Sequence, residues 1–237
     1  MRKNSGNTKV IGIIVIGIIL IIAGILGYFM YDSIQYSVLA QEISKINNEK
    51  RVDLDIKSKG KYEDLERGIK EYANEYYSNI NKLKELYSKD ELKNMLSIQN
   101  IKNDGPNFDT TKTTITNFVS EQNNIKEKLQ NMTSEEYLNK KVEEYSLDAK
   151  KRGLFLSTLD LKEDANKIIG IIDSYLKYVN SIDSVINFLK ENKDNWSIKD
   201  DKIMFKNVEL LNNYNSLIST QKDVQIELKN KLSNNKV

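Results

Sequence analysis

The feature that most constrains this chain is an apolar run over residues 10–31 that carries no charged side chain. As a helix rising about 1.5 Å per residue, the run would span about 33 Å, enough to cross a bilayer core of about 30 Å. The alternative is a cleaved signal peptide, and Val38-Leu39-Ala40 loosely resembles a cleavage site. The apolar region of a signal peptide is, however, only about 7–15 residues long. The run therefore predicts an uncleaved transmembrane signal anchor.

Basic residues flank the run unequally. Three of them precede it, whereas the first one after it is Lys45. The positive-inside rule then places residues 1–9 in the cytoplasm and residues 32–237 outside the cell membrane. Aromatic rings that could anchor at the outer interface stand at the end of the run: Tyr28, Phe29 and Tyr31. We therefore expect a single-pass protein of the cell membrane.

The composition excludes several function classes. Lys and Arg number 36 and Asp and Glu 34, so the formal net charge is +2 and no clustered basic excess indicates a nucleic-acid binder. There is no cysteine, hence no disulfide, thiol nucleophile or thiolate metal site. There is no histidine, the commonest general base and metal ligand. The abundance of Lys and Asn with little Arg is typical of an AT-rich genome and indicates a bacterial source.

Apolar residues recur at spacings of three and four along most of the outer region, as in helices with one buried face. The most regular stripe predicts a helix of about 30 residues and comprises Ala165, Ile168, Ile172, Tyr175, Val179, Ile182, Ile186 and Leu189. Similar stripes run over 62–87, 115–132 and 211–232. Joined by short connections, they predict an all-α fold in which the transmembrane helix leads into an elongated antiparallel helical bundle with coiled-coil packing.

Residues 196–205 are the one segment with strand character. If Asp200 and Asp201 form a two-residue loop, the segment becomes a β-hairpin with its apolar side chains on one face. Two pairs would then lie on that face: Ile198 with Ile203, and Trp196 with Phe205. A loop projecting from one end of a bundle is a candidate partner contact, and its residues are Lys199, Asp200, Asp201 and Lys202. The alternative is a simple connector that caps the bundle.

Tyrosines are frequent between residues 62 and 87, and aromatic faces often bind partner surfaces. Most of these tyrosines follow the apolar stripe, which favours packing in the core. Tyr77 lies off the stripe and is therefore the second candidate for a partner contact.

No motif predicts catalysis. Adjacent carboxylates lie in polar, charge-dense stretches where they are ordinarily solvated, and no phosphate-binding glycine loop is present. We therefore predict that the chain is not an enzyme and that it has no catalytic, cofactor-binding or metal-binding residues.

These observations predict a membrane-anchored extracytoplasmic helical-bundle protein with a binding, scaffolding or sensing role at the bacterial cell envelope. The cytoplasmic tail, residues 1–9, is too short for an enzyme domain. Two alternatives stay open: an envelope enzyme or enzyme accessory acting on cell-wall polymer, and a subunit of a self-assembling membrane complex joined through small residues such as Gly17 and Gly24. The expected partners are the membrane and a protein or second copy, and no nucleic acid.

Overall fold

Helices make up most of the computed structural model, which confirms the predicted all-α class. It describes the backbone of three stretches, 5–89, 91–158 and 162–235. Side chains within these stretches are described except at 5–22, 91, 158, 162 and 235. The helices in chain order are α1 (Ser5–Glu49), α2 (Glu63–Ser88), α3 (Glu91–Asn94), α4 (Ile98–Asp104), α5 (Asp109–Met132), α6 (Glu135–Glu144), α7 (Ala149–Thr158), α8 (Lys162–Glu191) and α9 (Val208–Asn235). The short elements are the 3-10 helices η1 (Gly60–Tyr62) and η2 (Lys193–Asn195) and the strands β1 (Trp196–Lys199) and β2 (Lys202–Phe205).

The chain forms two compact units. Unit 1 comprises Met1–Asn74 and Lys141–Thr158, and unit 2 comprises Glu75–Lys140 and Leu159–Val237. The boundary falls inside α2 and again inside α6, so both helices contribute residues to each unit. A single outer domain over residues 32–237 stays a prediction.

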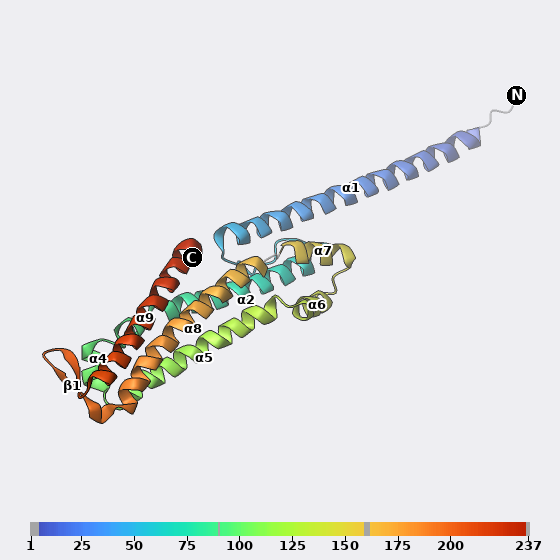
Figure 1. Cartoon of the computed structure of the whole chain (residues 1–237). Helices are drawn as coiled ribbons and strands as arrows, with labels where there is room; N and C mark the ends of the chain where they lie inside the picture. Colours follow the sequence, from blue (N-terminus) through green and yellow to red (C-terminus); the bar gives the residue numbers. More distant parts are fainter. Residues whose placement is uncertain (1–4, 90, 159–161, 236–237) are drawn as a thin grey trace. The chain divides into compact units, whose positions relative to one another are not determined.

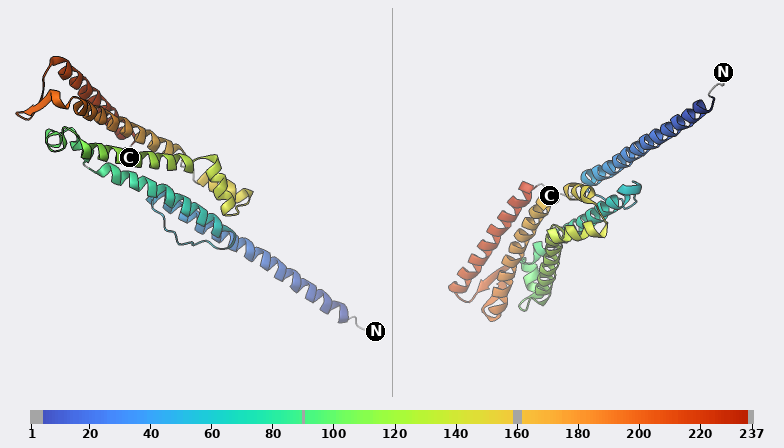
Figure 2. Two further views of the ribbon diagram at one scale, coloured as in Figure 1. Left: turned by 90° about the horizontal axis from the view of Figure 1, so that it is seen from below. Right: turned by 90° about the vertical axis from the view of Figure 1, so that its right-hand side faces the viewer.

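The core of unit 2 is built around α8, which lies between α5 and α9 (Figures 1 and 2). The stripe that predicts a helix of about 30 residues corresponds to α8, which has 30 residues. Its spacing brings Ile172, Val179 and Ile186 to one face, and all three are fully buried. Ion pairs across the α5–α8 contact join Lys112 to Asp183 and Lys126 to Asp173, each with a nitrogen–oxygen distance of 2.6 Å.

The segment over 196–205 is the β-hairpin that the sequence predicts. Its strands are antiparallel, with Trp196 opposite Phe205 and Ile198 opposite Ile203. Asp200 and Asp201 form the two-residue loop and have φ angles of 49° and 55°. Two residues with positive φ are the signature of a type I′ turn, whose twist matches that of the two strands.

Unit 1 packs the last part of α1 against the first half of α2. Leu39 and Ile46 of α1 are buried, as are Leu65 and Ile69 of α2. From α7, Phe155 packs edge-on against Tyr72, with ring centroids 6.2 Å apart. A stripe of apolar residues on each helix thus closes this core.

The predicted transmembrane run, residues 10–31, falls within α1. Among the residues whose placement the structure describes, no helix combines the length and the apolar character needed to cross a bilayer. Residues 10–22 of the run lie outside those with described side chains.

Ile172 offers a direct test of the unit 2 core. We expect Ile172→Asp to reduce the free energy of unfolding by at least about 4 kcal/mol, because a carboxylate would be buried without a partner. Asn180→Asp is the matched control, since it places the same charge at an exposed position of the same helix. The measurement is thermal and urea unfolding followed by circular dichroism. Equal melting of the two variants would contradict the assigned core.

Candidate functional site

The predicted contact residues of the hairpin tip lie together and are exposed: Lys199, Asp200, Asp201 and Lys202. One of them is tied to the rest of unit 2, because the carboxylate of Asp201 forms an ion pair with the ammonium of Lys102 in α4, with a nitrogen–oxygen distance of 2.6 Å. Both partners are solvent-exposed, so this pair contributes little free energy.

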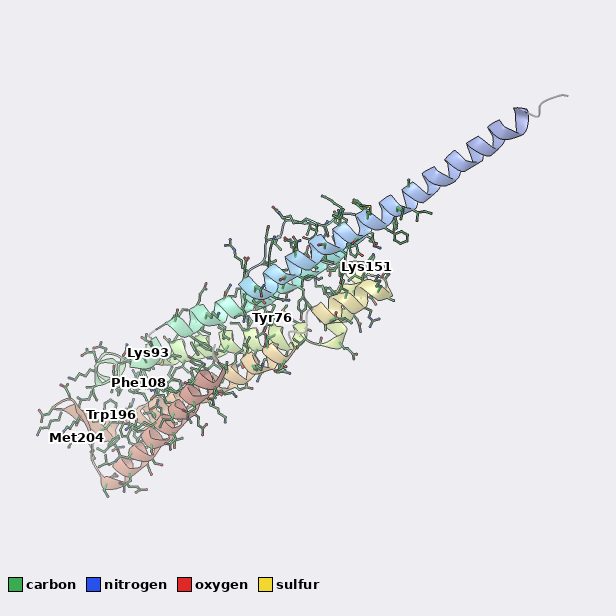
Figure 3. All side chains as sticks on the ribbon, turned by 90° about the horizontal axis from the view of Figure 1, so that it is seen from above. Tyr76, Lys93, Phe108, Lys151, Trp196 and Met204 are labelled. Carbon is green, nitrogen blue, oxygen red and sulfur yellow. The ribbon has the colours of Figure 1, made fainter. Side chains whose placement is uncertain are left out.

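The base of the hairpin fixes the tip more firmly. The indole Nε1 of Trp196 donates a hydrogen bond to the carbonyl oxygen of Leu189 at 2.8 Å, and the ring lies 6.3 Å from that of Phe108. On the paired strand, Phe205 packs between Phe188 and Tyr214, with ring centroids at 5.9 and 5.2 Å. Figure 3 shows Trp196 beside Phe108 at the end of the unit that carries Met204. The base of the hairpin is therefore held by aromatic packing, and the tip extends from this base.

Exposed apolar side chains occur on β2 and in the first turn of α9, which follows the hairpin in the sequence. Met204 points outward from β2 and is 50% exposed, and Val208 at the start of α9 is 69% exposed. Leu211, one turn further along α9, is also exposed. We call Lys199–Lys202, Met204, Val208 and Leu211 the hairpin-end surface. Its mixture of charged and apolar groups is suited to a protein contact.

Tyr77, the other predicted contact residue, is half-buried rather than fully exposed. Its ring packs edge-on against Tyr76, with centroids 5.4 Å apart. Burial raises the pKa of its hydroxyl, and the charge of Asp164 adds to this. In Figure 3 the neighbouring Tyr76 lies well away from Trp196 and Met204. The structure therefore does not bring Tyr77 into the hairpin-end surface.

A small cavity in unit 2 lies beside a pair of stacked tyrosines. The rings of Tyr87 and Tyr175 are 3.6 Å apart and nearly parallel, and burial raises the pKa of both hydroxyls. The cavity has a volume of about 200 Å³, and Leu92, Leu228 and Leu232 contribute apolar walls. Binding sites for small molecules are usually about 300–1,000 Å³, so we assign no ligand to it.

Unit 1 contains a buried ionic cluster, formed by Glu42, Glu66 and Lys70. The ammonium of Lys70 is 2.7 Å from a carboxylate oxygen of Glu42, 2.7 Å from one of Glu66 and 2.7 Å from the carbonyl oxygen of Asp55. Only 1% of the side chains of Lys70 and Glu66 is exposed, and 7% of that of Glu42. All three donors of the ammonium thus have acceptors.

The cluster also holds the extended segment that precedes η1. Glu66 accepts backbone N–H groups from Lys57 at 3.0 Å and from Ser58 at 2.6 Å. Glu42 accepts a second ammonium, that of Lys45, at 2.6 Å. Every carboxylate of the cluster therefore has charged or backbone donors, and the cluster joins α1, α2 and the segment between them.

The ionisation of the cluster fits a structural role. Burial by itself would raise the pKa of Glu66, but hydrogen bonds from Lys70 and from the backbone outweigh it and hold the pKa below 4.5. Burial likewise opposes the charge of Lys70, but its bonds to Glu42 and Glu66 raise its pKa. A general acid needs a raised carboxyl pKa and a nucleophilic lysine a lowered one. These groups are shifted in the opposite directions.

Metal ligation finds no support among the residues that the structure describes, because no three acidic side chains converge there. No protein-family profile, curated protein or solved structure matches the chain.

Removal of the buried ammonium should destabilise unit 1. We expect Lys70→Met to reduce the free energy of unfolding by about 3–5 kcal/mol, because Glu42 and Glu66 would keep buried charges without a cation. The matched control is Lys45→Met, which removes the exposed partner of the same Glu42 and should cost about 1 kcal/mol or less. Urea unfolding gives the free energies, and hydrogen exchange reports on the amides of Lys57 and Ser58. Equal losses of unfolding free energy in the two variants would show that Lys70 stabilises unit 1 no more than an exposed lysine does.

The cost of Lys70→Met should also depend on pH. In the native chain the pKa values of Glu42 and Glu66 are lowered, so their stabilisation is complete above 4.5 and is lost as the pH falls through the lowered values. Without Lys70 the same buried carboxylates should have raised pKa values. As the pH falls, their protonation would remove the buried negative charges and so reduce the destabilisation of the variant. The free-energy difference between the two proteins should therefore shrink between about pH 7 and about pH 4. A difference that stays constant over this range would contradict the assignment.

Proposed function

We propose that the chain is a single-pass membrane protein whose extracytoplasmic helical region binds a protein partner through the hairpin-end surface and catalyses no reaction. The membrane part rests on the uncharged run over residues 10–31 and its unequal basic flanks. The binding part rests on the packed base and the exposed apolar residues of the hairpin end.

The described end of the run supports a lipid environment. Leu26, Phe29 and Met30 lie near the middle of α1, and each exposes more than half of its surface. The exposed set continues along the helix and also includes Ile25, Tyr28 and Tyr31. Contiguous exposure of large apolar side chains is unusual in water but ordinary for a helix that faces lipid and its interface.

The proposed absence of catalysis is supported by the structural role of the buried charged groups in unit 1. The buried cluster of Glu42, Glu66 and Lys70 has its donors matched to acceptors and its groups held charged, which leaves it no proton to exchange near neutral pH. The residues of this cluster thus fix the backbone and are not free for chemistry.

The single observation that carries the proposal is the exposure of apolar side chains on β2 of the hairpin and in the first turn of α9. Met204 and Val208 expose half or more of their surface, whereas Phe205, which lies between them in the sequence, packs against Phe188 and Tyr214. A protein partner would cover these side chains, and the charged tip would supply the polar rim of such a contact.

Site-specific photo-crosslinking in native membranes tests this proposal. Probes at Lys199 and Met204 should each crosslink to the same protein. A probe at Lys222, an exposed residue further along α9, is the control and should not crosslink to that protein. Crosslinks only to a second copy of the chain would show that the surface mediates self-assembly and would overturn binding to a different protein. Equal capture at all three positions, or none, would contradict the hairpin-end surface.

A further inference from the structure

We propose that unit 1 binds the headgroup of an anionic phospholipid in a cavity between α1 and α7. The cavity has a volume of about 620 Å³, and Phe29 and Tyr36 of α1 and Lys150 and Leu154 of α7 lie along it. The inference rests on the proposed membrane anchor, because the anchor sets the depth of the cavity relative to the bilayer.

The position of the cavity along α1 matches the headgroup layer. The predicted span ends at Tyr31, and Tyr36 lies five residues later, about 7.5 Å along a helix. The polar layer on one side of a bilayer is about 5–8 Å thick. A cavity that extends from Phe29 to Tyr36 therefore begins at the end of the acyl region and crosses the headgroup region.

The groups that line the cavity suit a phospholipid. Phe29, Tyr62 and Leu154 offer apolar surface to the first carbons of an acyl chain. The hydroxyl of Ser33 can donate a hydrogen bond to phosphate or glycerol oxygens, and so can those of the tyrosines.

One lining lysine is available to an anion. Among the residues that the structure describes, Lys150 has no carboxylate partner. Asp32, the acidic residue on the cavity wall, is paired with Lys61 at 2.6 Å and so presents little net negative charge. The balance of charge at the cavity therefore favours a phosphate over a neutral or cationic group.

Further basic residues lie on the elements that line the cavity. They come from the segment beside η1 and from the first turn of α7, and comprise Lys59, Lys61 and Lys151. Asp148 pairs with Lys151 at 3.3 Å, and Asp32 with Lys61, so the group keeps a positive excess. Basic clusters next to a membrane span attract anionic lipids.

The segment beside η1 is fixed against α1 at this depth. The backbone N–H of Lys59 donates to the side-chain oxygen of Gln35 at 2.7 Å, and the rings of Tyr36 and Tyr62 pack with centroids 5.8 Å apart. Lys59 and Lys61 are thus held by the fold beside the helix that we propose to cross the bilayer.

Lipid photo-crosslinking on the full chain tests the inference. The protein is reconstituted into nanodiscs containing equal amounts of photoactivatable phosphatidylglycerol and phosphatidylcholine, and the crosslinked peptides are mapped by mass spectrometry. Phosphatidylglycerol should label the α1 and α7 peptides in clear excess over phosphatidylcholine. Lys150→Gln should reduce this preference about fivefold, the effect of losing one basic residue at an anionic surface.

Two controls separate the possible failures. Lys222→Gln removes the charge of an exposed lysine in unit 2 and should leave the preference unchanged, and circular dichroism checks that each variant folds. Incorporation without a preference for phosphatidylglycerol, or a preference that Lys150→Gln does not alter, would overturn the headgroup site while leaving the anchor standing. Failure of the folded chain to incorporate into any nanodisc would overturn the anchor, and the headgroup site with it.

Discussion

The buried ammonium of Lys70 is the interaction on which unit 1 depends. It bridges Glu42 on α1 and Glu66 on α2, and through Glu66 it also holds the backbone that leads into η1. Ions buried in this way stabilise a fold only when their partners are complete. The orientation of α1 against α2 is therefore set by a few short contacts as well as by apolar packing. If α1 crosses the membrane, this cluster is also what joins the anchor to the folded part of unit 1.

Unit 2 is held together mainly by apolar packing rather than by buried charges. Its core relies on the regular apolar face of α8, and its exposed end is capped by a hairpin whose Trp196 and Phe205 pack against helices. The ion pairs of this unit are partly exposed and lie at the margins of the helix contacts. Apolar burial dominates there, and the charged tip stays exposed, with Asp201 paired to Lys102.

The spacing of apolar residues along the sequence correctly predicted the long helix α8 and the register of the hairpin. The extent of α8 follows from a spacing near 3.5, and the register of the hairpin follows from strand alternation around Asp200 and Asp201. The cluster around Lys70 was missed because Glu66 and Lys70 look like an ordinary exposed helix pair, and burial depends on Glu42, which is 28 residues from Lys70 in the sequence. Tyr77, predicted as a contact candidate from its spacing, is half-buried, and its contact role stays a prediction. The exposure of Val208 depends on where α9 begins, which the apolar stripe did not reveal.

The most direct test of the account is the topology of the chain in intact bacterial cells. The native sequence has no cysteine, so a single introduced one reports its own position. Lys199→Cys, on the exposed hairpin, should react with a membrane-impermeant maleimide on intact cells, whereas Ser5→Cys should react only after the membrane is permeabilised. Protection of position 199 together with labelling of position 5 would invert the orientation. Labelling of neither position until the cells are opened would contradict an extracytoplasmic binding role altogether.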